Sequence, residues 1–380
     1  MAEQDTAPET DQIPGALHPR ETPQLFGQDR AERTFLDAWA NNHLHHAWLI
    51  RGPGGVGKAT LAYRIARAIL ADGPGNDPAG LFGDAAGAPT SLDVPPECAI
   101  APRIRAGAEP RLAVLRLGVQ ARTGKPRTQI VVDDVRAMKS FLHLSAADGG
   151  WRVVLVDAVD QMNRSAANAL LKMLEEPPAK TLMLLVSHAP GSLLPTIRSR
   201  CRFLDLDPLN PEDLAKALAQ QETDIPAGSE AALAELAAGS VGRALWLISG
   251  NGLNLYSRIV EVITTGKVDR SAMVALAAQT NGRDGVATFS LIADLVQVMM
   301  SRMARTAATG MKPQAVSTHE ITVMAKLASN PAQARLWANA AARTGDSMRH
   351  AMAVNLDPGQ TIIDTFLDLD TTLGQARHTA

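Results

Sequence analysis

Three short, almost uninterrupted apolar runs mark the first half of the chain. They occupy residues 47–50, 151–156 and 181–187. Runs of this length without polar alternation are typical of strands buried on both faces, as in parallel sheets. Between them, apolar positions recur at helical spacing over residues 30–39, 61–70 and 164–175. The alternation of strands and helices from about residue 45 to residue 205 predicts a doubly wound parallel α/β sheet.

Two stretches of this first half lack such periodicity. Residues 1–22 are polar with scattered prolines, and we expect a flexible tail there. Residues 72–126 are rich in Gly, Pro and Ala, which predicts an insertion, or a partly disordered excursion, within a domain that spans residues 23–206. The arginines of the insertion could contact phosphate or a partner, although scattered solvated charge is the simpler explanation; they are Arg103, Arg105, Arg111 and Arg116.

After Asp207-Pro208 only helical patterns follow. Residues 207–250 predict a small three-helix lid, with helices over 211–219 and 229–237 and a third that opens at 239–245. Residues 251–375 are also helical, and Gly, Pro and Asn breaks separate the segments. Because no fixed-period repeat is present, we expect a globular all-α domain rather than a solenoid.

Composition and charge narrow the class of protein. The 380 residues are 46% hydrophobic and 4% aromatic, which suits helix-rich cores of Ala, Leu and Val. The net charge of −2 gives no global basic field for nucleic acid. The two cysteines, Cys98 and Cys201, lie far apart, which argues against a disulfide framework or a zinc cluster. The polar N-terminus and the absence of an apolar run near ~18 residues favour a cytoplasmic protein without membrane contact.

A glycine-rich loop follows the first apolar run. It reads Gly52-Pro53-Gly54-Gly55-Val56-Gly57-Lys58, and a helical pattern begins after it. Strand, glycine loop and helix are the context of a phosphate-binding loop, in which backbone N–H groups, the helix dipole and the lysine attract phosphate. We therefore predict that Gly52, Gly54, Gly55, Gly57 and Lys58 bind a nucleotide.

The loop departs from the usual motif in one position. A Ser or Thr that ligates Mg²⁺ is expected after the lysine, and this chain has Ala59. Thr60 is also a candidate nucleotide-binding residue, but one residue further along a helix faces about 100° away. We therefore expect that phosphate binding survives and that Mg²⁺ is held weakly, if at all.

Two further candidates end the buried strands. Asp157 stands where a P-loop nucleoside triphosphatase keeps the carboxylate that holds Mg²⁺ through water, and Ser187 ends the next strand. In a doubly wound sheet the carboxyl ends of strands share one edge, so both should meet the P-loop. The glutamate that commonly polarises the attacking water after the aspartate is replaced by Ala158. His43, His45 and His46 could suggest a metal, but no carboxylate or thiol accompanies them, and packing or exposure is the simpler interpretation.

Several segments together carry a family resemblance. They are residues 45–50 with the P-loop, Asn163–Lys172 with Leu174-Glu175-Glu176-Pro177-Pro178, Leu194–Cys201, and Gly239–Leu245. In this order they resemble the clamp-loader AAA+ family, specifically the delta-prime subunits of bacterial DNA polymerase III. The resemblance covers residues 23–250, whereas the C-terminal helices fit only by length and class.

The resemblance implies roles for individual residues. Ser199-Arg200-Cys201 matches the arginine-finger motif, so Arg200 would reach the γ-phosphate held by a neighbouring subunit. Arg243 falls at the sensor-2 position of the lid, and Ser187 falls near sensor 1. The family's zinc module of four cysteines is missing, so no zinc is expected.

The resemblance also implies an assembly. The C-terminal helices would form the collar of a hetero-pentameric ring with gamma/tau and delta subunits, which loads the sliding clamp onto primed DNA during replication. Delta-prime subunits are regarded as the stationary member, which agrees with Ala59 and Ala158; own ATPase activity is expected to be weak or absent. The alternatives are an active AAA+ ATPase of the gamma/tau motor type and, less compatible with the helical second half, a small-molecule P-loop kinase.

Overall fold

The structure is a computed structural model, and it contains two compact units. It describes residues 12, 16–72, 89–95, 97–119, 127–143, 150–221, 223, 225–226, 228–264, 267–282, 284–311 and 314–378. The first unit consists of Met1–Thr223 with Gly239–Arg243, and the second of Asp224–Ala238 with Ala244–Ala380.

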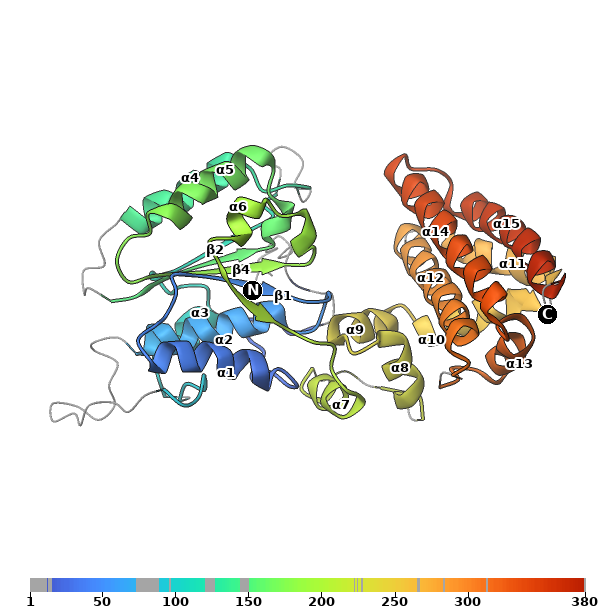
Figure 1. The fold of residues 1–380 in the computed structure, drawn as a ribbon, viewed down its shortest axis with the longest axis horizontal. Helices are drawn as coiled ribbons and strands as arrows, with labels where there is room; N and C mark the ends of the chain where they lie inside the picture. The colour runs from blue at the N-terminus through green and yellow to red at the C-terminus, as the bar shows by residue number, and fades with distance from the viewer. Residues whose placement is uncertain are drawn as a thin grey trace, which may run out of the picture. The chain divides into compact units, whose positions relative to one another are not determined.

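A five-stranded, fully parallel sheet forms the centre of the first unit (Figure 1). Its strands, in the spatial order β2-β3-β4-β1-β5, are β2 (Leu112–Arg116), β3 (Arg152–Asp157), β4 (Thr181–Ser187), β1 (Ala47–Arg51) and β5 (Arg202–Asp205). The three inner strands are the three apolar runs of the sequence, and β4 is buried along its whole length. The predicted parallel sheet is therefore confirmed.

Helices cover both faces of this sheet (Figure 1). One face is covered by α1 (Asp29–Ala40), α2 (Lys58–Ala71) and α3 (Ile100–Arg105), and the other by α4 (Val132–His143), α5 (Arg164–Glu175) and α6 (Pro195–Arg198). Alternate residues of β1 divide between the faces: Leu49 packs in the cluster with α5 and α6, and the Trp48 ring lies 5.2 Å from the Phe35 ring of α1. Burial on both faces explains why the inner strands carry no polar alternation.

The expected insertion at residues 72–126 contains regular structure. Residues 73–88, 96 and 120–126 lie outside the described part, but α3 and the edge strand β2 fall within the segment. Of its arginines, Arg111 and Arg103 form ion pairs with the buried carboxylate of Glu109, at 2.9 and 3.9 Å. The Gly- and Pro-rich composition therefore hid a strand whose side chains are mostly half-exposed.

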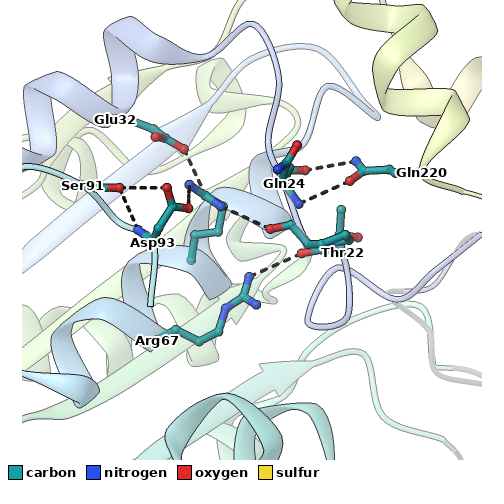
Figure 2. A network of polar contacts seen from close by, with 9 residues as sticks. Thr22, Gln24, Glu32, Arg67, Ser91, Asp93 and Gln220 are labelled. Carbon is teal, nitrogen blue, oxygen red and sulfur yellow. Dashed lines mark hydrogen bonds and ion pairs between the residues drawn. The ribbon is translucent and has the colours of Figure 1, made fainter. Parts of the chain in front are cut away.

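A buried arginine contacts this segment at Asp93 and also holds the residues that follow the expected N-terminal tail. Arg64 of α2 donates to Glu32 at 3.1 Å, to Asp93 at 3.0 Å and to the carbonyl oxygen of Pro23 at 3.3 Å (Figure 2). Beside it, Arg67 donates to the carbonyl oxygen of Thr22. Of the expected flexible tail, residues 1–11 and 13–15 lie outside the described part; residues 16–22 are packed against the domain, with Thr22 buried.

The helices of the expected lid are α7 (Pro211–Ala219), α8 (Glu230–Ala237) and α9 (Val241–Ser249). Of these helices, α7 and the start of α9 belong to the first unit, while α8 and the rest of α9 belong to the second. The physical reason lies in their contacts. Glu235 of α8 forms an ion pair with Arg302 of the second unit, whereas Ser240, just before α9, bonds to the P-loop.

Over its described residues, the second unit is helical apart from two antiparallel strands of two residues each. It continues with α10 (Gly252–Val262), β6 (Ile263–Thr264), β7 (Lys267–Val268), α11 (Arg270–Ala277), α12 (Gly285–Thr309), α13 (Thr318–Leu327), α14 (Pro331–Ala353) and α15 (Pro358–His378). Three short 3-10 turns are also described: Val159–Gln161 and Pro190–Ser192 lie in the first unit, and Ala278–Thr280 lies in the second. Among the described helices, α12 has the length and apolarity to cross a membrane, but its buried side chains pack within this unit.

Arg302, in the C-terminal third of α12, is 2% exposed. Its Nε lies 2.9 Å from Oε1 of Glu320, and its Nη2 donates to the carbonyl oxygen of Gln314 at 2.8 Å. Glu235 of α8 and the Tyr256 hydroxyl complete the network. These acceptors compensate the buried guanidinium for its lost hydration. The network as a whole joins α8, α10, α12 and α13.

Candidate nucleotide site

The strand register brings the predicted site residues to one edge of the sheet. Arg51, the last residue of β1, is paired with Ser187 of β4, and Asp157 of β3 is paired with Val186. The P-loop begins at the residue after Arg51, so it leaves the sheet beside Ser187 and Asp157. The carboxyl edge of a parallel sheet is where such folds hold ligands.

The P-loop adopts a conformation that depends on glycine. Gly55 has φ +72° and Gly57 has φ +98°, both in the left-handed region that side-chain-bearing residues rarely adopt. The buried side chain of Gln28, which is 4% exposed, bonds to this loop. Its Nε2 donates to the carbonyl oxygens of Val56 at 3.3 Å and Asp207 at 2.8 Å. The loop is thereby fixed to the segment that follows β5.

Lys58 is turned toward the P-loop itself. Its Nζ donates to the carbonyl oxygen of Gly52 at 2.8 Å and to that of Pro53, and the side chain is 3% exposed. Burial lowers the pKa of Lys58 to about 8, although Asp157 and Asp160 act in the opposite direction. A cation held among carbonyl oxygens at the mouth of a glycine loop is suited to a phosphate.

The segment before α9 closes onto the same loop. Ser240 Oγ donates to the carbonyl oxygen of Gly54 at 2.8 Å and accepts from the N–H of Arg243 at 3.1 Å, so it also caps α9. The N–H of Gly242 donates to the carbonyl oxygen of Gly55 at 3.1 Å. Arg243, the expected sensor-2 residue, is therefore anchored by its backbone beside the P-loop.

Polar side chains that end the central strands gather near Lys58. The His188 N–H, one residue after β4, donates to Oδ1 of Asp160 at 2.9 Å. Partial desolvation and the charge of Lys58 lower the pKa of His188, while Asp160 opposes them. Ser187 is fully buried, and its Oγ forms no hydrogen bond within the described part of the chain.

The positions expected to serve Mg²⁺ and hydrolysis differ in their surroundings. Ala59 is half-exposed at the start of α2, whereas Thr60 beside it is 8% exposed and points into the fold. Ala158 is 2% exposed, so a longer acidic side chain at this position would itself be buried. The donors present suit a phosphate, and the side chains of Ala59 and Ala158 carry no oxygen that could coordinate Mg²⁺.

Arg200 lies away from this edge, after α6. The side chain is 36% exposed, and its Nη2 lies 2.8 Å from Oε1 of Glu175. Its Nη1 donates to the carbonyl oxygen of Thr196 at 3.0 Å. The structure thus separates Arg200 from the chain's own P-loop group and leaves it at the surface of the first unit.

The histidines before β1 make packing contacts. His45 and His46 stack with ring centroids 4.3 Å apart, and His46 Nε2 lies 2.9 Å from the carbonyl oxygen of Leu174. Burial and the neighbouring His45 lower the pKa of His46. Over the described residues, no group of three or more His, Cys, Asp or Glu side chains is placed to hold a metal ion.

Three residues of the site did not emerge from the sequence. Gln28 and Ser240 reach the P-loop only through tertiary structure, so no local pattern could reveal them. His188 had a usable signal, because it directly follows a buried strand whose last residue, Ser187, was already a candidate.

Comparison with known proteins gives a consistent set of relatives. A family model described as DNA polymerase III, delta subunit, matches residues 27–210. The DNA polymerase III subunit delta' of Pseudomonas aeruginosa is 41% identical over 156 residues, which are 41% of this chain and 41% of that protein. The delta' subunit of Escherichia coli strain K12 is 30% identical over 259 residues, 68% of this chain and 70% of that protein. Among solved structures, the Thermotoga maritima RuvB Holliday junction branch migration motor is 15% identical with a TM-score of 0.38, over 84% of this chain and 91% of that chain.

Proposed function

The chain belongs to the family of DNA polymerase III delta-prime subunits, and from that premise we propose that it is a clamp-loader subunit with a trans-acting arginine. In this role Arg200 reaches the γ-phosphate bound by a neighbouring subunit. The chain's own site binds nucleotide without efficient hydrolysis.

The observation that carries this proposal is the contrast between two parts of the site. Lys58 and the glycine loop retain the features that attract phosphate. Ala158, by contrast, stands directly after Asp157, at the position where a catalytic glutamate is expected, and it is 2% exposed. A chain that has the P-loop and its lysine but lacks the groups for hydrolysis suits a subunit that responds to nucleotide but does not turn it over.

The proposal extends to ligands and partners. ATP or ADP would contact Gly52, Gly54, Gly55, Gly57 and Lys58, with Asp157, Ser187 and Arg243 around the phosphates and Thr60 behind the loop. Mg²⁺ would be held weakly for want of a hydroxyl at Ala59. The partners would be gamma/tau and delta subunits in a five-membered ring, and through that ring the sliding clamp and primed DNA, in the cytoplasm.

The test is Arg200→Ala in the reconstituted clamp loader. We expect normal folding of this chain and a fall of about 10³-fold or more in hydrolysis at the one neighbouring site that Arg200 serves. Arg202→Ala is the matched control, because Arg202 is an exposed arginine two positions further along. A mutant loader that hydrolyses ATP at the normal rate would show that Arg200 is not a finger.

One observation favours a second candidate, an active motor of the gamma/tau type. The gamma subunit of Buchnera aphidicola subsp. Schizaphis graminum is 29% identical over 196 residues, 52% of this chain and 47% of that protein. Steady-state ATPase measurement on the isolated chain separates the two candidates. Turnover well above background that Lys58→Met abolishes would favour the motor.

A further inference from the structure

Two motifs that are far apart in the sequence meet at the surface of the first unit. Glu175 is the last residue of α5 and belongs to the Leu-Glu-Glu-Pro-Pro segment, while Arg200 follows α6 in the Ser-Arg-Cys segment. They form the 2.8 Å ion pair, and the second terminal nitrogen of Arg200 donates to the carbonyl oxygen of Thr196. Both terminal nitrogens of the guanidinium are thus engaged by this chain.

The backbone on each side of this ion pair is fixed. Leu174, one residue before Glu175, is 2% exposed, and its carbonyl oxygen lies 2.9 Å from His46 Nε2. Ile197, in the turn before Arg200, is 1% exposed and packs in the same hydrophobic cluster as Leu174. The two side chains project from this fixed base and are 48% and 36% exposed, so the ion pair can open without disturbing the core.

We propose that Glu175 is a positioning residue that holds the Arg200 guanidinium against its own chain until a neighbour's phosphate displaces it. The inference rests on the proposed role of Arg200 as a trans-acting finger. Carboxylate and phosphate oxygens compete for the same N–H donors, and the γ-phosphate carries the greater charge. Because an exposed ion pair is weak, the competition favours phosphate once a neighbour presents it.

Glu176 provides a matched control for this role. It is adjacent to Glu175 and exposed, and within the described part of the chain it forms no ion pair. Glu176→Gln therefore removes the same charge as Glu175→Gln and leaves the Arg200 contact in place.

The first experiment measures ATP hydrolysis by the reconstituted clamp loader that contains Glu175→Gln, Glu176→Gln or Arg200→Ala. We expect Glu175→Gln to raise kcat/KM by up to about fivefold, the range open to an exposed ion pair, and Glu176→Gln to leave it unchanged. A Glu175→Gln loader with the wild-type or a lower kcat/KM would overturn the inference, while a depressed Arg200→Ala loader would still support the finger. Full activity of Arg200→Ala would instead overturn the proposed function.

The second experiment detects the ion pair in the isolated chain and needs no ring. Phenylglyoxal modifies accessible guanidinium groups, and peptide mass spectrometry measures its rate at Arg200. We expect faster modification in Glu175→Gln and the wild-type rate in Glu176→Gln. Equal rates in all three proteins would show that Glu175 does not hold Arg200.

Discussion

The hydroxyl of Ser240 donates to the carbonyl oxygen of Gly54 across 2.8 Å, which joins the start of α9 to the phosphate-binding loop. The N–H of Gly242 adds a second hydrogen bond, to the carbonyl oxygen of Gly55. Two hydrogen bonds therefore join the P-loop to the start of α9. A substitution that moves the P-loop backbone should therefore disturb the start of α9, and a substitution at the start of α9 should disturb the P-loop.

Gly55→Ala should break this connection. A Cβ at Gly55 would lie 2.4 Å from Ser240 Oγ and 2.9 Å from the Gly242 nitrogen, and the φ of +72° is unfavourable for alanine. We expect a loss of about 2 kcal/mol or more in the free energy of unfolding, measured by guanidinium denaturation. Gly54→Ala is the control, because a Cβ there meets no atom within 4 Å. Equal stability of the two variants would mean that the α9 contact contributes little.

Lys58 should make the free energy of unfolding depend on pH between about pH 8 and pH 10.5. Burial lowers the pKa of Lys58 from 10.5 to about 8, so between these pH values the unfolded chain holds a proton that the folded chain has released. The free energy of unfolding should therefore rise with pH across this window, by about 2–3 kcal/mol relative to Lys58→Met, which cannot titrate. Urea unfolding at pH 8 and pH 10 measures the difference. Parallel pH profiles for the two proteins would contradict it.

The two alanines of the site should respond differently to restoration of the missing side chains. Ala158 is 2% exposed, so Ala158→Glu should overpack the structure and place a carboxylate where water is excluded, at a loss of several kcal/mol in the free energy of unfolding. Ala59 is half-exposed, so Ala59→Ser should be tolerated within about 0.5 kcal/mol.

Ala59→Ser and Ala158→Glu should also differ in nucleotide binding and in ATPase activity. The serine hydroxyl should strengthen Mg²⁺-dependent nucleotide binding, because hydroxyl oxygen is a ligand that Mg²⁺ accepts. Ala158→Glu should not create ATPase activity. Fluorescent nucleotide titration with and without Mg²⁺, beside a steady-state ATPase assay, measures both effects. A stable Ala158→Glu protein with brisk turnover would show that the site lacks only one side chain.

The sequence revealed the inner strands but hid the edges of the sheet. β1, β3 and β4 are apolar on both faces, so their composition alone identified them. β2 and β5 lie at the two edges, and most of their side chains are half-exposed or exposed, which removed the apolar signature. The P-loop followed from its glycine spacing, whereas Ser240 reaches it through a contact that only the folded chain creates.

The division of α7, α8 and α9 between the two units also depends on tertiary contacts that the sequence does not show. Periodicity located α7, α8 and α9 within a residue or two. It could not show that α8 is tied by Glu235 to Arg302, a residue of α12 much further along the chain. Buried charge networks are set by three-dimensional neighbours, so an arginine within an apolar helix pattern carries no local sign of its partners.

Arg302 should be the side chain on which the second unit depends most. Its guanidinium is 2% exposed, and the carboxylate of Glu320, 3% exposed, accepts from it at 2.9 Å. Arg302→Met would leave that carboxylate buried without its cation, and loss of one partner of a buried ion pair costs about 3–5 kcal/mol. Arg305→Met, at an exposed position one turn along α12, should change the free energy of unfolding by no more than about 0.5 kcal/mol.

Urea denaturation followed by circular dichroism measures both Arg302 and Arg305 variants in the full chain. Arg302→Met combined with Glu320→Gln should recover part of the lost stability, because the neutral pair no longer buries an uncompensated charge. A double variant as unstable as the sum of its single variants would show that the two side chains act independently. The ion pair would then not be what joins α12 to α13.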